Sequence, residues 1–215
     1  METNTFNIIP RIGDNAPDFE ANSTWGKIKL SEYAKGSWVI LFSHPADFTP
    51  VCTTELTGFA LDEEEFNKLN TKLIGVSVDS IHSHIAWVSN VKKNLGVSLK
   101  FPLIADLDTK VARLYGMLQP GESETATVRA VFIIDPNFKI RIVIYYPLNV
   151  GRNLAEIKRA LIALQTADGN KVSLPLNWQP GEKVIVPPPK TLEELEAREK
   201  SDLEKIDFYL AKKSL

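Results

Sequence analysis

Residues 38–56 read WVILFSHPADFTPVCTTEL, and this stretch decides the fold. It opens with the apolar run Trp38–Phe42, whose length and turn-forming flanks are typical of a buried central strand. Further along, Pro50 suits the first position of a helix, which makes Thr49 the expected N-cap. The stretch therefore predicts a buried strand, a short loop and the beginning of a helix.

Cys52, the only cysteine among the 215 residues, falls in the first turn of that helix. A single cysteine can form neither an internal disulfide nor a cysteine-rich zinc site, so we expect a reduced, cytoplasmic protein. A free cysteine is most often a small buried apolar residue. At the start of a helix, however, free N–H groups and the positive end of the helix dipole stabilise an anion, which favours a reactive thiolate.

The composition narrows the class of protein. Hydrophobic residues make up 44% of the chain and charged residues 24%, which is typical of a globular protein. The formal net charge of −2 argues against binding to nucleic acid, which needs a basic surface. No apolar run approaches the roughly 18 residues of a membrane span, and the N-terminal residues show no signal-peptide pattern. We therefore expect neither a nucleic acid nor a membrane as a partner.

Strand and helix patterns follow one another after the first strand. They predict a helix over 53–69, a strand over 72–78, a helix over 81–95, a short strand over 102–104, a short helix over 108–115, a hairpin of strands over 129–135 and 139–146, and a helix over 153–165. This order is typical of an α/β fold with helices layered on a mixed central sheet.

Two of these elements also predict which side chains face the core. The helix over 81–95 carries an apolar stripe formed by Ile81, Ile85, Val88, Val91 and Leu95. In the second hairpin strand, Ile140, Ile142 and Ile144 alternate with other residues and are expected to share the buried face.

The composition changes in the C-terminal part of the chain. Asp168-Gly169-Asn170 predicts a turn, and the prolines that follow interrupt regular structure. Thr191-Leu-Glu-Glu194 is a capping-box pattern that opens a last, highly charged helix. We therefore expect a domain over residues 1–166, with a lead-in over 1–16, and an arm over 167–215 that packs on the domain or on a neighbouring subunit.

The residues around Cys52 also carry a family resemblance. The pattern Pro45-x-x-x-Thr49-x-x-Cys52 resembles the signature of the peroxiredoxins, which are thiol peroxidases, and residues 42–56 resemble the one-cysteine group of that family almost throughout. The resemblance extends over essentially the whole chain, including the long C-terminal arm. It implies a thioredoxin-like domain of three layers with a mixed central sheet and a C-terminal extension.

The resemblance implies roles for particular residues. Cys52 would attack hydrogen peroxide or a small organic hydroperoxide and become a sulfenic acid. Thr49 would offer its hydroxyl to the thiolate and the peroxide, Pro45 would shield the sulfur, and the N–H groups of Val51 and Cys52 would hold the peroxide. Arg129 would favour the thiolate and stabilise charge on the leaving oxygen.

Other residues near the motif are expected to assist. The resemblance implies that His44 and Arg152 are auxiliary groups of the site, and that Glu55 orients an arginine. His82 and His84, two positions apart on a predicted helix, do not share a face, and we interpret them as non-catalytic. The reaction would need no metal and no organic cofactor.

The single cysteine also bears on partners. With no second cysteine to resolve a sulfenic acid, the expected reductant is an external thiol or a redox protein. The resemblance implies a homodimer and a decameric ring of five dimers. Two other interpretations of the sequence remain: a cysteine hydrolase, and a non-enzymatic holdase or scaffold built on a thioredoxin-like fold.

Overall fold

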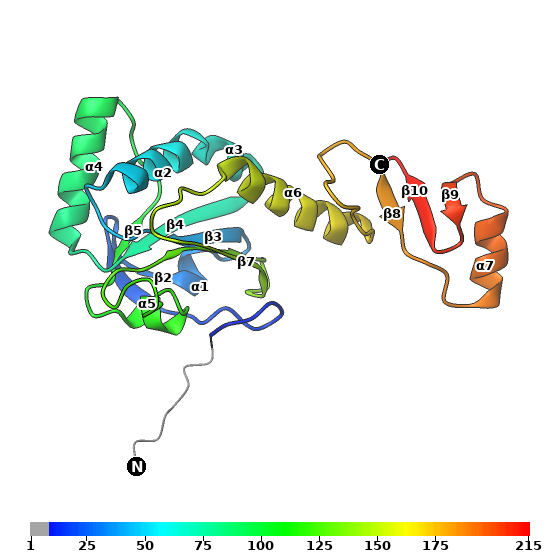
Figure 1. Ribbon diagram of the computed structural model, residues 1–215, viewed down its shortest axis with the longest axis horizontal. Coiled ribbons are helices and arrows are strands. Elements are labelled where there is room, and N and C mark those ends of the chain that lie inside the picture. The colour runs from blue at the N-terminus through cyan, green and yellow to red at the C-terminus, as the bar shows by residue number, and fades with distance from the viewer. Residues whose placement is uncertain (1–8) are drawn as a thin grey trace, which may run out of the picture. The chain divides into compact units, whose positions relative to one another are not determined.

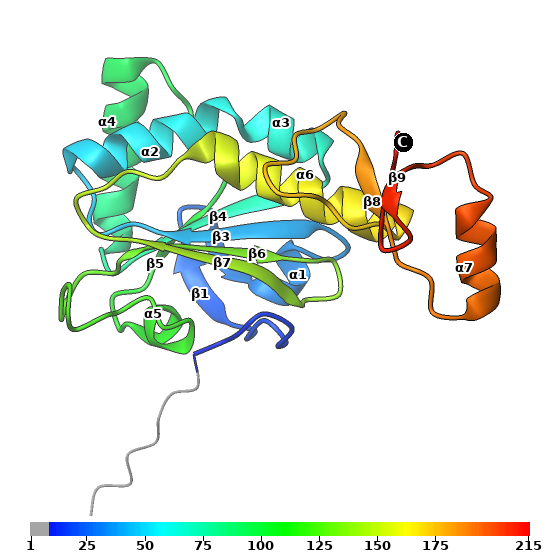
Figure 2. The same cartoon turned by 45° about the vertical axis from the view of Figure 1, so that its right-hand side comes forward.

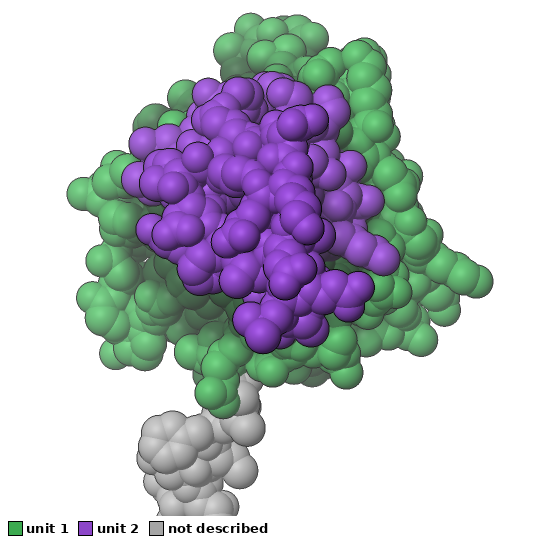
Figure 3. All heavy atoms as spheres, turned by 90° about the vertical axis from the view of Figure 1, so that its right-hand side faces the viewer, with its two compact units in different colours: residues 1–154 green, residues 155–215 purple. Residues whose placement is uncertain are grey.

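The computed structural model describes residues 9–215, so the first half of the predicted lead-in, residues 1–8, lies outside the described residues. The chain divides into two compact units, residues 1–154 and 155–215, which Figure 3 shows in different colours. The boundary that we expected after residue 166 lies inside a helix, α6 (Leu154–Asn170). That helix continues through Asp168-Gly169-Asn170, so the turn predicted there was wrong.

From residue 38 onward, the strands and helices of the first unit follow the order that the sequence predicted, whereas the two strands and the helix before residue 38 were not predicted (Figure 1). Its elements are β1 (Glu20–Ser23), β2 (Gly26–Lys29), α1 (Leu30–Tyr33), β3 (Trp38–Ser43), α2 (Pro50–Leu61), α3 (Glu63–Lys68), β4 (Thr71–Ser77), α4 (Ile81–Leu95), β5 (Leu103–Ala105), α5 (Lys110–Leu114), β6 (Arg129–Ile134) and β7 (Ile140–Tyr146). The single helix predicted over 53–69 is two helices, interrupted at Asp62.

The strands of the first unit form one mixed sheet of seven strands. Their order is β2-β1-β5-β4-β3-β6-β7. Strands β3, β4 and β5 are parallel, whereas β6 runs antiparallel to β3 and pairs with β7 as the predicted hairpin. The central strand β3 is buried along its whole length, and β7 lies at an edge of the sheet.

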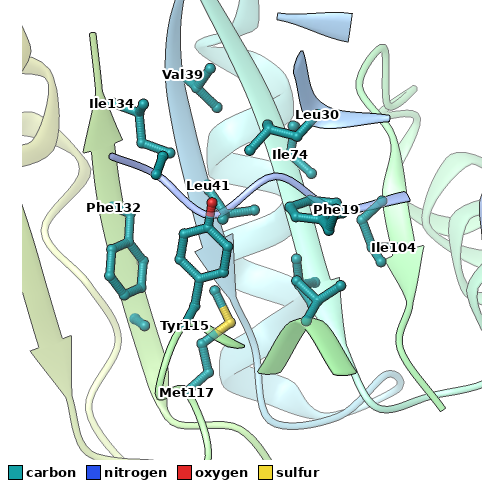
Figure 4. Packing of buried hydrophobic residues seen from close by; sticks show 14 of the residues in the cluster. Phe19, Leu30, Val39, Leu41, Ile74, Ile104, Tyr115, Met117, Phe132 and Ile134 are labelled. Carbon is teal, nitrogen blue, oxygen red and sulfur yellow. The ribbon is translucent and has the colours of Figure 1, made fainter. Parts of the chain in front are cut away.

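Helices cover both faces of this sheet (Figure 2). On one face, α1 and α5 pack on side chains of the strands, and Tyr115 lies edge-on to both Phe19 and Phe132 (Figure 4). On the other face, Phe42 of β3 stacks on Phe59 of α2, with ring centroids 4.1 Å apart. The unit is therefore a three-layer α/β domain with a thioredoxin-like fold, as expected.

The second hairpin strand differs from the prediction. A bulge shifts the register, so that Ile134 pairs with Ile140 while Ile133 pairs with Ile142. Across this bulge, the residues of β7 that point to a given face of the sheet change from even to odd numbers. Ile140 and Val143 therefore both pack on the core cluster beneath α1 and α5. The expectation that all three isoleucines of β7 share one buried face was therefore wrong, because one extra residue breaks the alternation.

The buried face of α4 also differs from the prediction. The helix has the predicted bounds, and Ser80 caps its first turn by accepting a hydrogen bond from the Ser83 amide. Its buried side chains are His84, Trp87 and Val91, whereas Ile85 and Leu95, which we assigned to the buried stripe, are more than half exposed. His84 and Trp87 can be buried because their ring nitrogens form hydrogen bonds with polar groups elsewhere in the domain.

The second unit combines most of α6 with a small antiparallel sheet. Its remaining elements are β8 (Val184–Val186), α7 (Leu192–Glu199), β9 (Glu204–Asp207) and β10 (Leu210–Lys213), with β10 between the other two strands. The side chain of Thr191 caps α7 by accepting from the Glu194 amide, which confirms the predicted N-cap. Trp178 and two valines form a small core, although the short strands themselves were not predicted. No helix within residues 9–215 is long and apolar enough to cross a membrane.

Candidate active site

Cys52 lies in the first turn of α2, where the sequence placed it. Pro50 is the first residue of the helix and Thr49 is the N-cap, both as predicted. The first helical bond runs from the Thr53 amide to the Thr49 carbonyl, so the amides of Val51 and Cys52 belong to the turn that lacks intrahelical acceptors. The Cys52 side chain is buried, with 1% of its surface exposed. The thiol therefore faces a protein environment at the positive end of a helix.

The loop between β3 and α2 holds Pro45 and Thr49, which are both half-buried. The Thr49 hydroxyl donates to the carbonyl of Ala46 at 2.9 Å, and its side chain makes no capping bond to the helix. Phe48 adopts a positive φ of 54°, an uncommon conformation for a bulky residue, and its side chain is 55% exposed. The loop that carries this proline and threonine therefore bends sharply at Phe48, just before Thr49.

Arg129 reaches Cys52 from across the sheet. The antiparallel register pairs Phe42 with Val131, and its continuation brings Arg129 level with the loop that follows β3. The Arg129 Nη1 atom donates to Cys52 Sγ at 3.4 Å and to Glu55 Oε2 at 2.7 Å. Nε and Nη2 both donate to the Leu148 carbonyl, at 3.0 and 2.6 Å. Three hydrogen bonds to two groups, the Glu55 carboxylate and the Leu148 carbonyl, therefore hold the guanidinium, and Nη1 also donates to the sulfur.

Glu55 connects this arginine to a second one. Arg152 donates to Glu55 through its backbone amide, Nε and Nη2, at 2.7–2.9 Å. Its Nη1 atom donates to the carbonyls of Ser43 and Ala130, and its guanidinium lies 5.2 Å from the centroid of the Phe42 ring. Glu55 therefore receives hydrogen bonds from both arginines, as a carboxylate that orients them would.

The pKa values of this cluster follow from burial and charge. Burial alone raises the pKa of Glu55, but the charge and hydrogen bonds of Arg152, with the charge of Arg129, outweigh it and hold that pKa below its usual range. Burial lowers the pKa of Arg152, and the neighbouring Glu55 carboxylate opposes that shift. Glu55 is thus a carboxylate between two guanidinium groups, so the buried cluster keeps a positive charge beside the thiol.

His44 belongs to a second buried cluster at the same loop. Its Nε2 atom lies 2.9 Å from one carboxylate oxygen of Asp47, and Nδ1 of His84 lies 2.8 Å from the other. The Nε2 atom of His84 also lies 3.0 Å from the Ile104 carbonyl. His82, by contrast, is exposed on α4.

Asp47 and His84 were not identified as site residues from the sequence. The spacing of His44 and Asp47 within one short loop was the available signal for the aspartate. His84 could not be linked to them by a local pattern, because it lies 37 positions from Asp47 and reaches it only through the packing of α4 on the sheet.

A buried thiol at the start of a helix, with a guanidinium donating to its sulfur inside a thioredoxin-like fold, defines a class of thiol-dependent peroxidases. Comparison with known families agrees with this class. The AhpC/TSA family matches residues 12–143, and the C-terminal domain of 1-Cys peroxiredoxin matches residues 163–202. The chain therefore belongs to the AhpC/TSA family, and within it to the one-cysteine peroxiredoxins.

Relatives similar in sequence and in structure cover nearly the whole chain. Peroxiredoxin 2 of Caldanaerobacter subterraneus is 55% identical over 94% of this chain and 93% of its own length. The peroxiredoxin of Aquifex aeolicus is 50% identical over 96% and 98%. A solved yeast mitochondrial 1-Cys peroxiredoxin is 43% identical, with a TM-score of 0.87 over 96% of this chain and 100% of that chain. Peroxiredoxin 6 of Arenicola marina, solved as a cysteine-to-serine mutant, is 38% identical with a TM-score of 0.85, covering 95% of this chain and 97% of that one.

These relatives settle the choice between the alternatives raised by the sequence. The chain is a thiol-dependent peroxidase with a single cysteine, and its relatives support neither a cysteine hydrolase nor a non-enzymatic scaffold.

Proposed function

We propose that the Cys52 thiolate reduces hydrogen peroxide and small organic hydroperoxides by direct attack on one peroxide oxygen. A bond forms between sulfur and that oxygen while the O–O bond breaks, and the second oxygen leaves with the electron pair as hydroxide or alkoxide. The leaving oxygen then takes a proton from water, and Cys52 remains as a sulfenic acid. The observation that carries this proposal is the hydrogen bond from Arg129 to the buried Cys52 sulfur.

Arg129 is proposed to act at two points of this step. Its positive charge favours the thiolate over the thiol before attack. It also stabilises the negative charge that grows on the leaving oxygen, which is the kind of contribution a preorganised donor makes. Its bonds to Leu148 and Glu55 support this role, because they hold the guanidinium in place before the substrate arrives.

The loop residues are proposed to bind the peroxide and protect the sulfur. Thr49, whose hydroxyl hydrogen is donated to Ala46, can accept a hydrogen bond from the peroxide at its hydroxyl oxygen. The amides of Val51 and Cys52 supply N–H donors at the start of α2. Pro45 limits access of water to the thiol. His44 is an auxiliary group of the same pocket.

Glu55 and Arg152 are proposed as positioning residues. Glu55 accepts from Arg129, and Arg152 balances its charge while bonding the ends of β3 and β6 through Ser43 and Ala130. These contacts support a role for Glu55 and Arg152 in orienting the Arg129 guanidinium. Neither residue needs to contact the peroxide for this role.

The reductant is proposed to be an external thiol or a redox protein, in a cytoplasmic setting that keeps thiols reduced. The sequence contains one cysteine, so one copy of the chain cannot resolve its own sulfenic acid as a disulfide. The yeast mitochondrial relative is described as resolved through the glutathione/thioredoxin systems. Reductants of those two kinds are therefore the first to test here.

A homodimer, and a decameric ring of five dimers, are proposed as the assembly. The supporting feature is β7, an edge strand of the sheet, because an open strand edge favours pairing with another chain. Light scattering at micromolar concentration should give at least twice the 24.0 kDa mass of one chain, and a monomer would contradict both assemblies.

Turnover tests the proposed reaction. With dithiothreitol as reductant, the protein should consume hydrogen peroxide catalytically, and Cys52→Ser should abolish this. Peroxide consumption that persists in Cys52→Ser would contradict the assignment of the nucleophile.

A further inference from the structure

Phe48, in the loop before α2, holds a backbone conformation that a bulky residue rarely adopts. Its φ of 54° lies in the left-handed region, where the Cβ atom of an ordinary residue is crowded. The side chain is 55% exposed, so packing of the ring gives little compensation for this strain. A strained residue persists only where the surrounding structure imposes its conformation, and such residues gather at functional sites.

Asp47, the residue before Phe48, is fixed first by its backbone. Its N–H group donates to a carboxylate oxygen of Asp79 at 3.1 Å. The same oxygen accepts from the hydroxyl of Ser77 at 2.7 Å, and Ser77 is fully buried at the end of β4. Asp79 therefore ties the backbone of the loop to the end of a central strand.

Asp47 is fixed a second time by its side chain, which is 1% exposed. Its carboxylate oxygens lie 2.9 Å from Nε2 of His44 and 2.8 Å from Nδ1 of His84. The other ring nitrogen of His84 lies 3.0 Å from the Ile104 carbonyl. Carbonyl and carboxylate oxygens can only accept, so both nitrogens of His84 donate and the ring is an imidazolium.

The pKa directions of this pair agree with an ion pair. Burial lowers the pKa of His84, but the hydrogen bond and charge of Asp47 and the bond to Ile104 outweigh it and raise that pKa. Burial raises the pKa of Asp47, but the bonds and charges of the two histidines prevail and hold it well below its usual range. Asp47 is therefore held at its amide by Asp79 and at its carboxylate by a buried cation.

Thr49, the residue after Phe48, is the N-cap of α2. The side chain of an N-cap residue ordinarily accepts from the amide of the second or third helical residue. Those amides belong here to Val51 and Cys52, and the Thr49 side chain accepts from neither. Its hydroxyl instead donates to the Ala46 carbonyl, across the two residues between them. The conformation at residue 48 therefore sets where this hydroxyl lies.

We propose that Asp79 is a positioning residue of the peroxidase site. Together with the His84 ion pair it fixes Asp47 and so imposes the left-handed conformation at Phe48. That conformation keeps the Thr49 hydroxyl on the loop and off the first amides of α2, so that its oxygen and those amides stay available to the peroxide. The inference rests on the proposed role of Thr49 in binding the peroxide, and Asp79 itself need not touch the reacting atoms.

Removal of the anchor gives the first measurement. In Asp79→Ala the Asp47 amide loses its acceptor, and residue 48 can relax to an ordinary negative φ. The rate constant for Cys52 oxidation, measured by stopped flow, should fall by roughly 2- to 13-fold, the range for loss of one neutral hydrogen bond. Asp79→Asn keeps an oxygen that accepts from the same amide and should lie close to the parent. Equal losses in the alanine and asparagine variants would speak against an anchoring hydrogen bond.

A milder variant acts on the same anchor. Ser77→Ala leaves the Asp79 carboxylate in place but removes the hydroxyl that holds it. It should slow oxidation of Cys52 by less than Asp79→Ala does. Urea unfolding establishes that each variant is folded before its rate is compared with that of the parent. A folded Asp79→Ala protein that reacts at the parent rate would overturn the proposal.

The decisive comparison is made at Phe48 within the Asp79→Ala protein. Glycine adopts a positive φ about as readily as a negative one, whereas alanine does not. Both substitutions remove the ring, which lies 6.4 Å from the Trp87 ring, so the pair differs only by one methyl group. Phe48→Gly should recover at least about half of the lost rate, and Phe48→Ala should recover none.

The same pair in the parent protein is the control. Where Asp79 imposes the conformation, Phe48→Gly and Phe48→Ala should react alike. A role of Asp79 in general stability would not be repaired by a glycine at an exposed loop position. Equal rates for the two substitutions in the Asp79→Ala protein would therefore refute the positioning role.

A double-mutant cycle with Thr49→Val tests whether Asp79 acts through the Thr49 hydroxyl. Removal of the anchor from a protein that already lacks this hydroxyl should cost little more. The combined loss of rate should therefore lie close to that of Thr49→Val alone. Two losses that simply multiply would show that Asp79 acts by another route.

These outcomes also distinguish the inference from the proposed function. If Cys52 fails to react with peroxide in the parent protein, the proposed function is wrong. If the parent reacts but the glycine and alanine substitutions do not differ in the Asp79→Ala protein, the peroxidase assignment stands and the role of Asp79 is wrong.

Discussion

Arg129 donates a hydrogen bond to the sulfur of Cys52 from a position 77 residues away in the chain. The same Nη1 atom donates to Glu55, one helical turn after the cysteine. The strand that carries the arginine and the helix that carries the cysteine are thus joined at the atom that reacts.

Arg129→Lys should keep a positive charge near the sulfur but lose the fixed fork of donors. Removal of one preorganised donor to a developing anion typically costs about 10²–10³ in rate, so we expect the rate constant for Cys52 oxidation to fall by about that factor. Stopped-flow measurement of peroxide reduction checks this. Arg113→Lys, at an exposed arginine, is the matched control and should leave the rate unchanged.

Glu55→Gln should destabilise the fold, because it leaves two buried guanidinium groups without their counter-ion. Removal of one partner from a buried ion pair typically costs about 3–5 kcal/mol. The pKa of Glu55 is held below its usual range in the folded state, so its contribution is fully present above about pH 4.5 and is lost as the pH falls through the folded-state pKa. The difference in unfolding free energy between parent and variant should therefore shrink in acid.

Urea unfolding at about pH 7 and about pH 4 tests the sign of this effect. A difference that grows as the pH falls would show that Glu55 is not a stabilising carboxylate in the folded protein.

Thr49→Ser and Thr49→Val separate the contribution of the Thr49 hydroxyl to the reaction rate from that of the β-branched side-chain shape. The serine keeps a hydroxyl that can bond to Ala46 and to the peroxide, whereas valine keeps only the shape. A neutral hydrogen bond is worth about 0.5–1.5 kcal/mol, so Thr49→Val should slow oxidation of Cys52 by roughly 2- to 13-fold. Thr49→Ser should lie close to the parent. Equal rates for serine and valine would refute a role for the hydroxyl.

Gly75→Ala tests the packing beneath the site. A Cβ atom at this position of β4 would lie 2.5 Å from the Leu103 side chain and 3.3 Å from the Phe42 ring, which are both buried. Overpacking of a core typically costs about 1–3 kcal/mol, which should appear as a lower urea midpoint. Gly121→Ala, where an added Cβ meets nothing within 4 Å, should leave the midpoint near that of the parent.

The sequence was most informative where the signals are local. Thr49 and Pro50 mark the start of α2 as predicted, because caps act within one turn of a helix. Arg129 was identified only because the motif around Cys52 resembles a family that supplies an arginine from a distant strand. Its contact with Cys52 depends on the register between β3 and β6, which no local pattern encodes.

The failures also have physical causes. The stripe predicted for α4 was rotated, since His84 and Trp87 find polar partners on the domain and can be buried in place of Ile85 and Leu95. The bulge in β7 inserts one residue that alternation cannot anticipate. The Asp47–His84 pair was missed for the same reason as the rotated stripe: the partners of a buried polar group are set by tertiary packing.

The most direct test of the central claim is the intact mass of the protein after one equivalent of hydrogen peroxide. A gain of one oxygen atom, together with loss of the single titratable thiol, is expected because Cys52 becomes a sulfenic acid; excess peroxide should add further oxygens at the same residue. A trapping reagent for sulfenic acids should label Cys52 in the parent and nothing in Cys52→Ser. An unchanged mass with the thiol still titratable would contradict the account.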